Sequence, residues 1–259
     1  GNITIGDNSA ALYTKNNAKS ENSGNITVGK DSVGLYGDTV NDILNTGNII
    51  VGENSKAIYL KEAVLTSDVN TGKISSTSNS AIGIYSEYTG TVPTLIKTSN
   101  EIDLSGDKTI GVYATGTGVQ NVENSNIIKI GDSTDGNNPS MGIYSNNAGN
   151  NITNSGAMTV GKKSLAIYNV GGNVVNNGTL NIGENGVGIF SDGGNITISN
   201  ASNVNIGNNS AIGAYGVNGT NIQNNSSNIK IGNGSYVFMA ESESNLTKNG
   251  SMILGDNGV

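Results

Sequence analysis

Acidic side chains recur at one place in this sequence, directly after a short aliphatic segment. They are Asp7, Asp31, Glu53, Asp107, Asp132, Glu184 and Asp256. Regularly spaced carboxylates can hold calcium, because calcium prefers oxygen ligands. Calcium-binding β-rolls, however, repeat Gly-Gly-x-Gly-x-Asp in nine-residue units, and that pattern is absent here. Because Asn208 and Asn233 occupy the same column, we predict turn-forming side chains and no metal site.

Two carboxylates could also cleave a polysaccharide by acid–base or nucleophilic chemistry. The acids, however, are spread one per repeat, and the chain contains no arginine to assist a lyase. It also lacks histidine and cysteine, which excludes Ser/His and Cys/His nucleophile pairs and removes the usual ligands of zinc, copper and haem. We therefore expect a protein that is not an enzyme and has no cofactor. A polysaccharide lyase or hydrolase is the most distant alternative.

An aromatic residue ends a second aliphatic segment in each repeat. The column is Tyr13, Tyr36, Tyr59, Tyr85, Tyr113, Tyr144, Tyr168, Phe190, Tyr215 and Phe238. Gly or Ala stands two positions earlier in nine of the ten copies. Strand alternation would place the aliphatic residues one and three positions earlier inside, with the ring and the small residue outside or at a corner. Tyrosine suits sugar or protein surfaces, so Tyr85, Tyr113 and Tyr144 are candidate binding residues. The alternative is a purely structural aromatic stack.

Three repeats contain insertions, and solenoids often bind through such irregular loops. The insertions cover residues 60–68, 86–93 and 132–139. The two prolines of the chain lie in the second and third, as expected of segments that leave a strand ladder. Candidate contact residues are Glu87, Tyr88, Asp132 and Asp135. We expect Tyr88 to be the most exposed aromatic residue; the alternative is that these loops are only tolerated length variation.

All these columns belong to one internal repeat of about 24 residues. The motif Asn-Ile-Thr-Ile-Gly at 2–6 recurs as Asn-Ile-Thr-Val-Gly at 25–29 and Asn-Ile-Ile-Val-Gly at 48–52, and looser copies follow to the end of the chain. Each copy has three short period-2 runs separated by Gly, Asn, Asp and Ser, which is the pattern of strands and turns. We predict an all-β, single-stranded parallel, right-handed β-helix of about eleven coils, three short strands per coil, continuous over residues 1–259.

The first run of each repeat supplies a pair of aliphatic residues that should point into the coil. The pairs are Ile3/Ile5, Ile26/Val28, Ile49/Val51, Ile102/Leu104, Ile128/Ile130, Met158/Val160, Leu180/Ile182, Val204/Ile206, Ile229/Ile231 and Met252/Leu254. Ile74/Ser76 is the one defective pair. A single repeat cannot bury such a pair alone, so we expect stability to come from stacked neighbours.

An asparagine column follows the third run of the repeat. It contains Asn22, Asn45, Asn70, Asn124, Asn154, Asn176, Asn200 and Asn225, and is broken at Thr98 and Lys248. Stacked amides can bond from one coil to the next as an internal ladder. Asparagine also tolerates the left-handed backbone of a tight turn. Both interpretations stay open, and they are compatible with each other.

The overall charge and the two ends of the chain limit its partners and its context. A net charge of -7 disfavours binding to nucleic acid or to anionic lipid. No signal peptide and no apolar run near 18 residues occurs. Because the sequence begins and stops in mid-repeat, we expect it to be a piece of a longer protein.

The repeat resembles the passenger repeats of large fusobacterial type V autotransporter adhesins, the RadD-like group. The similarity lies in segments such as 1–13, 22–36, 163–168 and 185–190, and it covers essentially the whole chain. The resemblance implies a bacterial cell-surface protein, anchored to the outer membrane by a C-terminal barrel that this sequence does not contain. It also implies adhesion to other bacteria or host cells through a surface glycan or protein. None of the family's binding residues maps onto a motif here.

Two functional interpretations therefore lead. The first is an adhesin segment whose outer face or inserted loops make the contact. The second is a spacer stalk, with binding elsewhere in the parent protein. The sequence alone does not decide between them.

Overall fold

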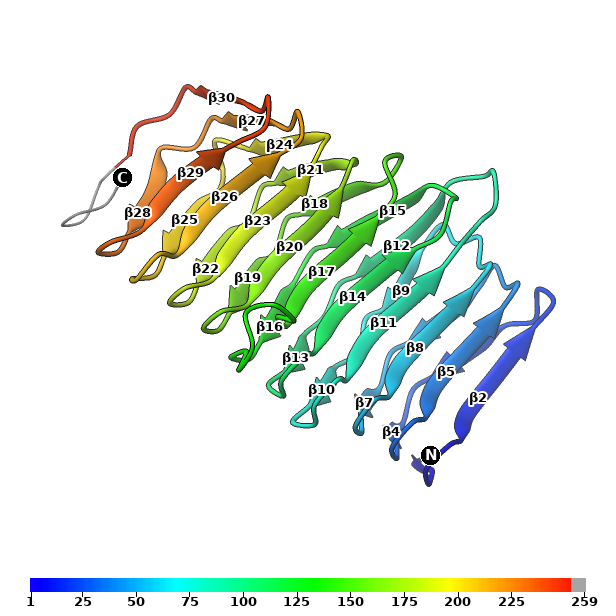
Figure 1. The fold of residues 1–259 in the computed structure, drawn as a ribbon. Helices are drawn as coiled ribbons and strands as arrows, with labels where there is room; N and C mark the ends of the chain where they lie inside the picture. Colours follow the sequence, from blue (N-terminus) through cyan, green and yellow to red (C-terminus); the bar gives the residue numbers. More distant parts are fainter. Residues whose placement is uncertain (253–259) are drawn as a thin grey trace.

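The computed structural model describes residues 1–252, which wind into a right-handed parallel β-helix with three sheets (Figure 1). The first sheet contains β1 (Ile3–Thr4), β4 (Asn25–Thr27), β7 (Asn48–Ile50), β10 (Ile74–Ser76), β13 (Ile102–Leu104), β16 (Ile127–Ile130), β19 (Ala157–Val160), β22 (Thr179–Ile182), β25 (Asn203–Ile206) and β28 (Asn228–Ile231). The middle sheet contains β2 (Ala10–Lys15), β5 (Val33–Asp38), β8 (Lys56–Lys61), β11 (Ile82–Glu87), β14 (Ile110–Thr115), β17 (Met141–Asn146), β20 (Leu165–Val170), β23 (Val187–Asp192), β26 (Ile212–Val217) and β29 (Tyr236–Ala240). The third sheet contains β3 (Ser20–Asn22), β6 (Ile43–Asn45), β9 (Asp68–Asn70), β12 (Thr94–Thr98), β15 (Gln120–Asn124), β18 (Asn151–Asn154), β21 (Asn173–Asn176), β24 (Asn195–Ile198), β27 (Asn221–Asn224) and β30 (Asn245–Lys248).

Each sheet is a ten-stranded parallel ladder, so the described residues form ten coils rather than the predicted eleven. Equivalent residues of successive repeats pair directly, as in Ile3 with Ile26 and Tyr36 with Tyr59. Of the predicted eleventh copy, Met252 is half-buried against the core, while Leu254 and Asp256 lie outside the described residues. No helix occurs in residues 1–252, and hence none of the length and hydropathy needed to cross a membrane.

The predicted inward pairs of the first sheet form one side of the core. Ile26, Ile49 and Ile102 have no exposed surface, and from the second coil to the tenth every member of these pairs is at most 7% exposed. In the first described coil, Ile3 and Ile5 are only half-buried. In the defective pair, Ser76 is buried and its hydroxyl donates to the Val51 carbonyl at 2.6 Å, so the preceding coil provides the hydrogen-bond partner of this buried hydroxyl.

The middle sheet departs from the predicted alternation. In β11, Ile82 and Tyr85 are half-buried, while both Gly83 and Ile84 between them are buried. The small residue therefore faces inward, and the aliphatic residue three positions before the ring faces outward, which reverses the prediction for both. The cause is space: a Cβ on Gly83 would lie 2.5 Å from the Gly111 carbonyl oxygen and 3.1 Å from Cγ2 of Ile102. The contact with Gly111 leaves no room for a Cβ at Gly83, and the equivalent inward position is Gly or Ala in every coil except the tenth, where it is Val237.

The aromatic column also ends differently from the prediction. Phe238 pairs with Ala214, which faces the core, and Met239 pairs with Tyr215. The outward position of the tenth coil is therefore occupied by Met239. The predicted position of the aromatic column in this coil, Phe238, is wrong by one residue. The error arises because Tyr236 replaces the aliphatic residue that begins this strand in most other coils.

The asparagine column forms an internal ladder. Nδ2 of Asn22 donates to Oδ1 of Asn45 at 2.7 Å, and Asn45 donates in turn to Asn70 at 2.8 Å. A second run joins Asn124, Asn154 and Asn176 at 2.7 and 2.6 Å. None of these residues has a positive φ angle, so the left-handed interpretation is wrong for this column.

Two members of the predicted asparagine column lie elsewhere. Ile198 pairs with Asn176, and Asn224 pairs with Ile198, so these residues hold the positions predicted for Asn200 and Asn225. Where Ile198 interrupts the ladder, Asn176 Nδ2 instead donates a hydrogen bond to Ser202 Oγ at 3.1 Å. The break is thus compensated from the adjacent turn.

Candidate functional site

The outer face of the middle sheet carries three parallel columns of side chains, one residue of each column per coil. The aliphatic column is Ala10, Val33, Lys56, Ile82, Ile110, Met141, Leu165, Val187, Ile212 and Tyr236. The aromatic column is Tyr13, Tyr36, Tyr59, Tyr85, Tyr113, Tyr144, Tyr168, Phe190, Tyr215 and Met239. The mixed column is Lys15, Asp38, Lys61, Glu87, Thr115, Asn146, Val170, Asp192, Val217 and Glu241.

The rings of the aromatic column contact one another from coil to coil. Neighbouring centroids lie 4.5–5.4 Å apart from Tyr13 to Tyr215, and five of the eight pairs are stacked with interplanar angles of 2–26°. The rings between Tyr36 and Tyr215 are half-buried, and Tyr13 at the end is 56% exposed. Tyr85, Tyr113 and Tyr144 therefore lie together as predicted. Because stacked rings cover one another's faces, the column presents ring edges and hydroxyl groups to solvent.

The stack is interrupted between Tyr59 and Tyr85, whose rings meet edge to face at 84°. The Lys56 ammonium lies at this break, 5.7 and 5.3 Å from the two ring centroids, within cation–π range. The Tyr59 hydroxyl donates to Oε2 of Glu87 at 3.0 Å. Burial raises the pKa of Tyr59, and this hydrogen bond raises it further. Glu87, a predicted contact residue, is thus held by the coil before it.

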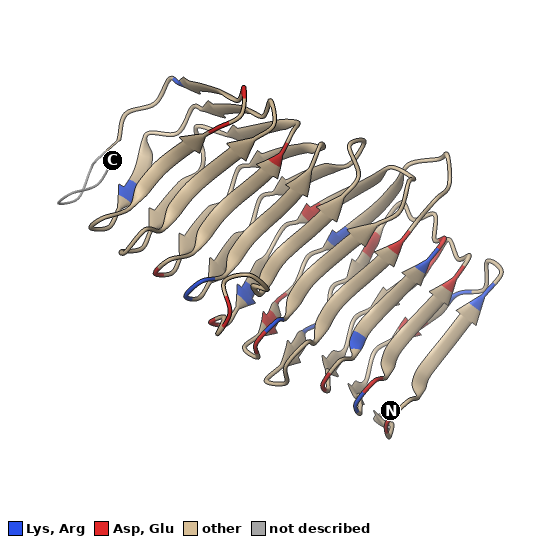
Figure 2. Ribbon diagram, in the orientation of Figure 1, with Lys and Arg blue, Asp and Glu red and all other residues tan. Residues whose placement is uncertain are grey.

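Charge is unevenly distributed along this face. The mixed column carries lysines and acids over the first four coils and uncharged residues over β14, β17 and β20. Beyond β20 it contains Asp192, Val217 and Glu241, so its charges there are all negative. The aliphatic column has no charge from Ile82 to Tyr236. Figure 2 shows most of the broad face of this sheet uncharged, with acidic and basic residues mainly near strand ends and turns. An extended half-exposed apolar strip with polar edges is typical of an interaction surface.

The insertion at 86–93 does not expose its tyrosine. Tyr88 is 2% exposed, and its hydroxyl donates to the Val92 carbonyl of the same loop. Its ring packs on two glycines: a Cβ on Gly90 or Gly118 would lie 2.4 or 2.5 Å from the ring or its hydroxyl. The prediction that Tyr88 is the most exposed aromatic residue is wrong, because the loop folds over it. The exposed apolar residue of this loop is Val92, at 58%.

The other two insertions differ in how far they leave the helix. In 60–68, Leu60, Ala63 and Leu65 are buried in the core. In 132–139, buried Ser133 anchors the loop, while residues 134–138 are exposed. Asp135 accepts the backbone N–H of Asn137 at 2.9 Å, which is an Asx turn.

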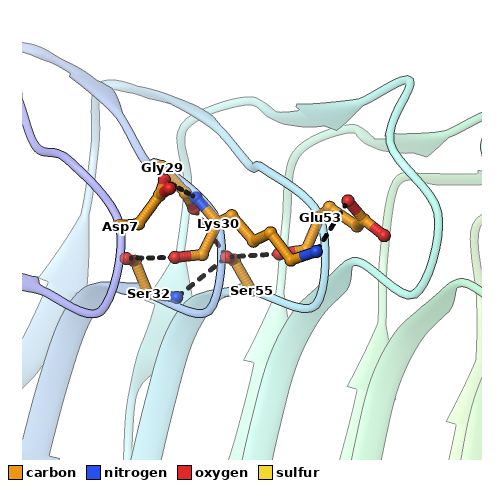
Figure 3. Close-up of polar contacts among 6 residues, drawn as sticks. All are labelled: Asp7, Gly29, Lys30, Ser32, Glu53 and Ser55. Carbon is orange, nitrogen blue, oxygen red and sulfur yellow. Dashed lines mark hydrogen bonds and ion pairs between the residues drawn. The ribbon is translucent and has the colours of Figure 1, made fainter.

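The acidic column stabilises turns between coils (Figure 3). Oδ1 of Asp7 accepts the Lys30 backbone N–H at 2.8 Å, and the Lys30 ammonium pairs with Glu53 at 3.3 Å. Asp132, another predicted contact residue, likewise accepts the Lys162 backbone N–H at 2.7 Å. Serines in the same turns form a second set of hydrogen bonds between coils. For example, the Ser32 backbone N–H donates to Ser55 Oγ at 2.9 Å. Residues 1–252 contain no cluster of three or more acidic side chains that could hold a metal ion.

The geometry thus unites Tyr85, Tyr113, Tyr144 and Glu87 on one face. Tyr88 lies in the 86–93 insertion, and Asp132 and Asp135 lie together in the 132–139 insertion. No family model, curated protein or solved structure matches the chain. The aliphatic column was missed from sequence. Its signal was present, since a column that is Gly or Ala in nine of ten copies indicates a crowded inward position and therefore an outward position for the residue before it.

Proposed function

We propose that this chain is a non-catalytic segment of a bacterial cell-surface adhesin, and that the outer face of the middle sheet makes its contacts. The observation that carries the proposal is the pairing of the aliphatic column with the aromatic column, half-exposed and free of charge in both columns from Ile82 onward. The similarity of the repeats to fusobacterial autotransporter passengers supports the location at the cell surface, with the parent protein anchored in the outer membrane.

The form of the surface favours a protein partner over a glycan. Sugars bind aromatic residues through open ring faces, whereas most rings here are covered by their neighbours above and below. Ring edges, hydroxyls and aliphatic side chains instead suit the mixed apolar and polar surface of another protein.

A spacer stalk is the second candidate, and the packing of the insertions favours it. Tyr88, Ala63 and Leu65 are buried, so two of the three insertions have much of their apolar surface in the core instead of offering it to a partner. A stalk needs only the three continuous ladders, which the chain has.

Competition for attachment separates the two candidates. The purified chain is added to bacteria that display the parent protein, together with partner bacteria or host cells, and attached cells are counted. We expect inhibition by the chain and its loss in Ile110→Asp, which places a charge in the aliphatic column. The matched control is Ile50→Asp, because Ile50 is 53% exposed on the first sheet. If the wild-type chain neither binds nor inhibits, the segment is a spacer.

A further inference from the structure

The three outward columns of the middle sheet are self-complementary when one copy is turned end over end. A twofold axis in the plane of the face and parallel to the strands reverses the order of coils and leaves each column opposite itself. If the axis lies midway between β14 and β17, then β14 faces β17 of the second copy, β11 faces β20, β8 faces β23, β5 faces β26 and β2 faces β29.

The charges of the mixed column match in this arrangement. Lys61 on β8 lies opposite Asp192 on β23, and Lys15 at the end of β2 lies opposite Glu241, which directly follows β29. The twofold axis doubles each pair, so the dimer has four contacts between opposite charges. The remaining acids, Asp38 and Glu87, face valines of the second copy. Asp38 is already paired with Lys15 at 3.2 Å, and Glu87 accepts the Tyr59 hydroxyl, so neither charge is left without a partner.

Neighbouring registers bring like charges together. With the axis on β17, Glu87 would face Asp192 and Asp38 would face Glu241. With the axis on β14, Asp38 would face Asp192. Like charges in direct opposition disfavour a register.

A parallel arrangement is also disfavoured. It would place each aliphatic residue opposite the mixed column of the same coil, which brings Lys56 against Lys61. Among the arrangements considered, the antiparallel register centred between β14 and β17 pairs opposite charges without opposing like ones.

The apolar part of the face matches in the same register. Ile110 lies opposite Met141, and Ile82 opposite Leu165, at the centre of the contact where the mixed column is uncharged. Ten coils spaced about 4.8 Å apart, each with six residues rising about 3.3 Å, give a face of roughly 950 Å². A stable interface buries about 800 Å² per partner. The face is therefore large enough for a dimer.

We propose that the outer face of the middle sheet binds a second copy of this chain, antiparallel and twofold symmetric, with the axis between β14 and β17. The inference rests on the use of this face as the contact surface proposed above, and it names the partner. Antiparallel pairing brings together chains that arrive from opposite directions, as two facing cells would present them.

Engineered cysteines test the register. The chain has no cysteine, so any disulfide comes from the introduced residues. In Glu87→Cys/Val170→Cys the two sites face each other across the proposed axis, and mild oxidation is expected to give a covalent dimer on a non-reducing gel. In the matched control Glu87→Cys/Asp192→Cys the sites face each other only in the register centred on β17. Crosslinking of the control in preference to the first variant would overturn the proposal.

Charge reversal tests the same contact without oxidation, by sedimentation velocity over a concentration series. Lys61→Glu and Asp192→Lys should each raise the dimer Kd at least tenfold, because two symmetric attractive pairs become repulsive. The double variant should return the Kd to within threefold of wild type. Lys230→Glu, an equal change of charge on the first sheet, should leave it unaltered. Circular dichroism verifies that each variant is folded.

Three results would overturn the inference: a wild-type chain that stays monomeric at about 100 µM, single variants that dimerise as wild type does, or a double variant that fails to recover. Failure of the dimer inference is distinguishable from failure of the proposed adhesive function. A monomeric chain that still inhibits attachment keeps the adhesin proposal and refutes the dimer. A dimer that does not affect attachment keeps the dimer and refutes the adhesive role.

Discussion

Removal of Asn154 tests how far the buried amide ladder stabilises the helix. Its side chain is fully buried, accepts a hydrogen bond from Asn124 at 2.7 Å and donates one to Asn176 at 2.6 Å. Asn154→Ala removes both bonds, worth about 1 kcal/mol each, and a longer one from Asn154 Nδ2 to the Gly156 carbonyl. It also leaves two buried amides each short of a partner, which costs about 1–3 kcal/mol per group. Asn124 keeps a bond to the Asn126 carbonyl. We therefore expect a loss near the lower limit of this sum, about 4 kcal/mol.

Native-state hydrogen exchange is the suitable assay, because repeat proteins open locally and a single global unfolding energy is not assured. We expect the loss to appear in β15, β18 and β21 and to fade with distance along the helix. The control is Asn151→Ala. Asn151 bonds Asn121 and Asn173 at 3.0 and 3.1 Å in an exposed ladder, so its removal should cost less than about 0.5 kcal/mol. Equal losses in the two variants would refute the assignment of stability to the buried ladder.

Three further changes have defined outcomes. Gly83→Val should destabilise the protein by more than about 3 kcal/mol and so lower its thermal midpoint, because the valine Cβ would lie 2.5 Å from a backbone oxygen. An unchanged midpoint would contradict the inward assignment of Gly83. Tyr88→Ala should cost about 3–5 kcal/mol locally and make the 86–93 loop sensitive to protease, which limited proteolysis measures against the wild-type digest. Hydrogen bonds from the Lys129 and Lys73 ammonium groups lower the pKa of Glu101 in the folded state. The stabilisation they give is therefore present above the unfolded pKa of about 4.3, and it is lost as pH falls through the folded pKa. Glu101→Gln should therefore lower stability by about 0.5–1 kcal/mol at pH 7 and have no effect near pH 2, as followed by thermal melts across pH; a loss that persists at low pH would mean that the charge is not responsible.

The repeat period alone predicts much of the fold. Aliphatic pairs such as Ile26/Val28 alternate strictly, so their inward orientation followed from strand geometry alone. Ten of the eleven predicted coils lie within the described residues, and the last copy extends largely beyond residue 252. The internal asparagine ladder was one of two open alternatives, and only backbone angles and distances could select it.

The predictions failed where local crowding or irregular turns overrode the period. Gly83 faces inward because the adjacent coil leaves no space for a side chain, a constraint between coils that a strand pattern does not contain. Asn200 was misplaced because its coil has extra turn residues that shift Ile198 into the ladder. Tyr88 is buried because the loop closes upon it, and loop closure depends on contacts such as Gly118 from the next repeat. The candidate surface was therefore found in part, through its ring column, and its aliphatic half was missed.

The three ladders have a mechanical consequence for a chain held at both ends. Each coil is bonded only to the coils before and after it, so tension applied to the chain ends acts on the outermost coil first. A released coil of about 24 residues extends to roughly 80 Å at about 3.4 Å per residue, and the stack shortens by only about 4.8 Å. The protein would then lengthen in steps of roughly 75 Å while the remaining coils keep their structure. Such stepwise extension limits the peak force on any contact that the intact coils hold.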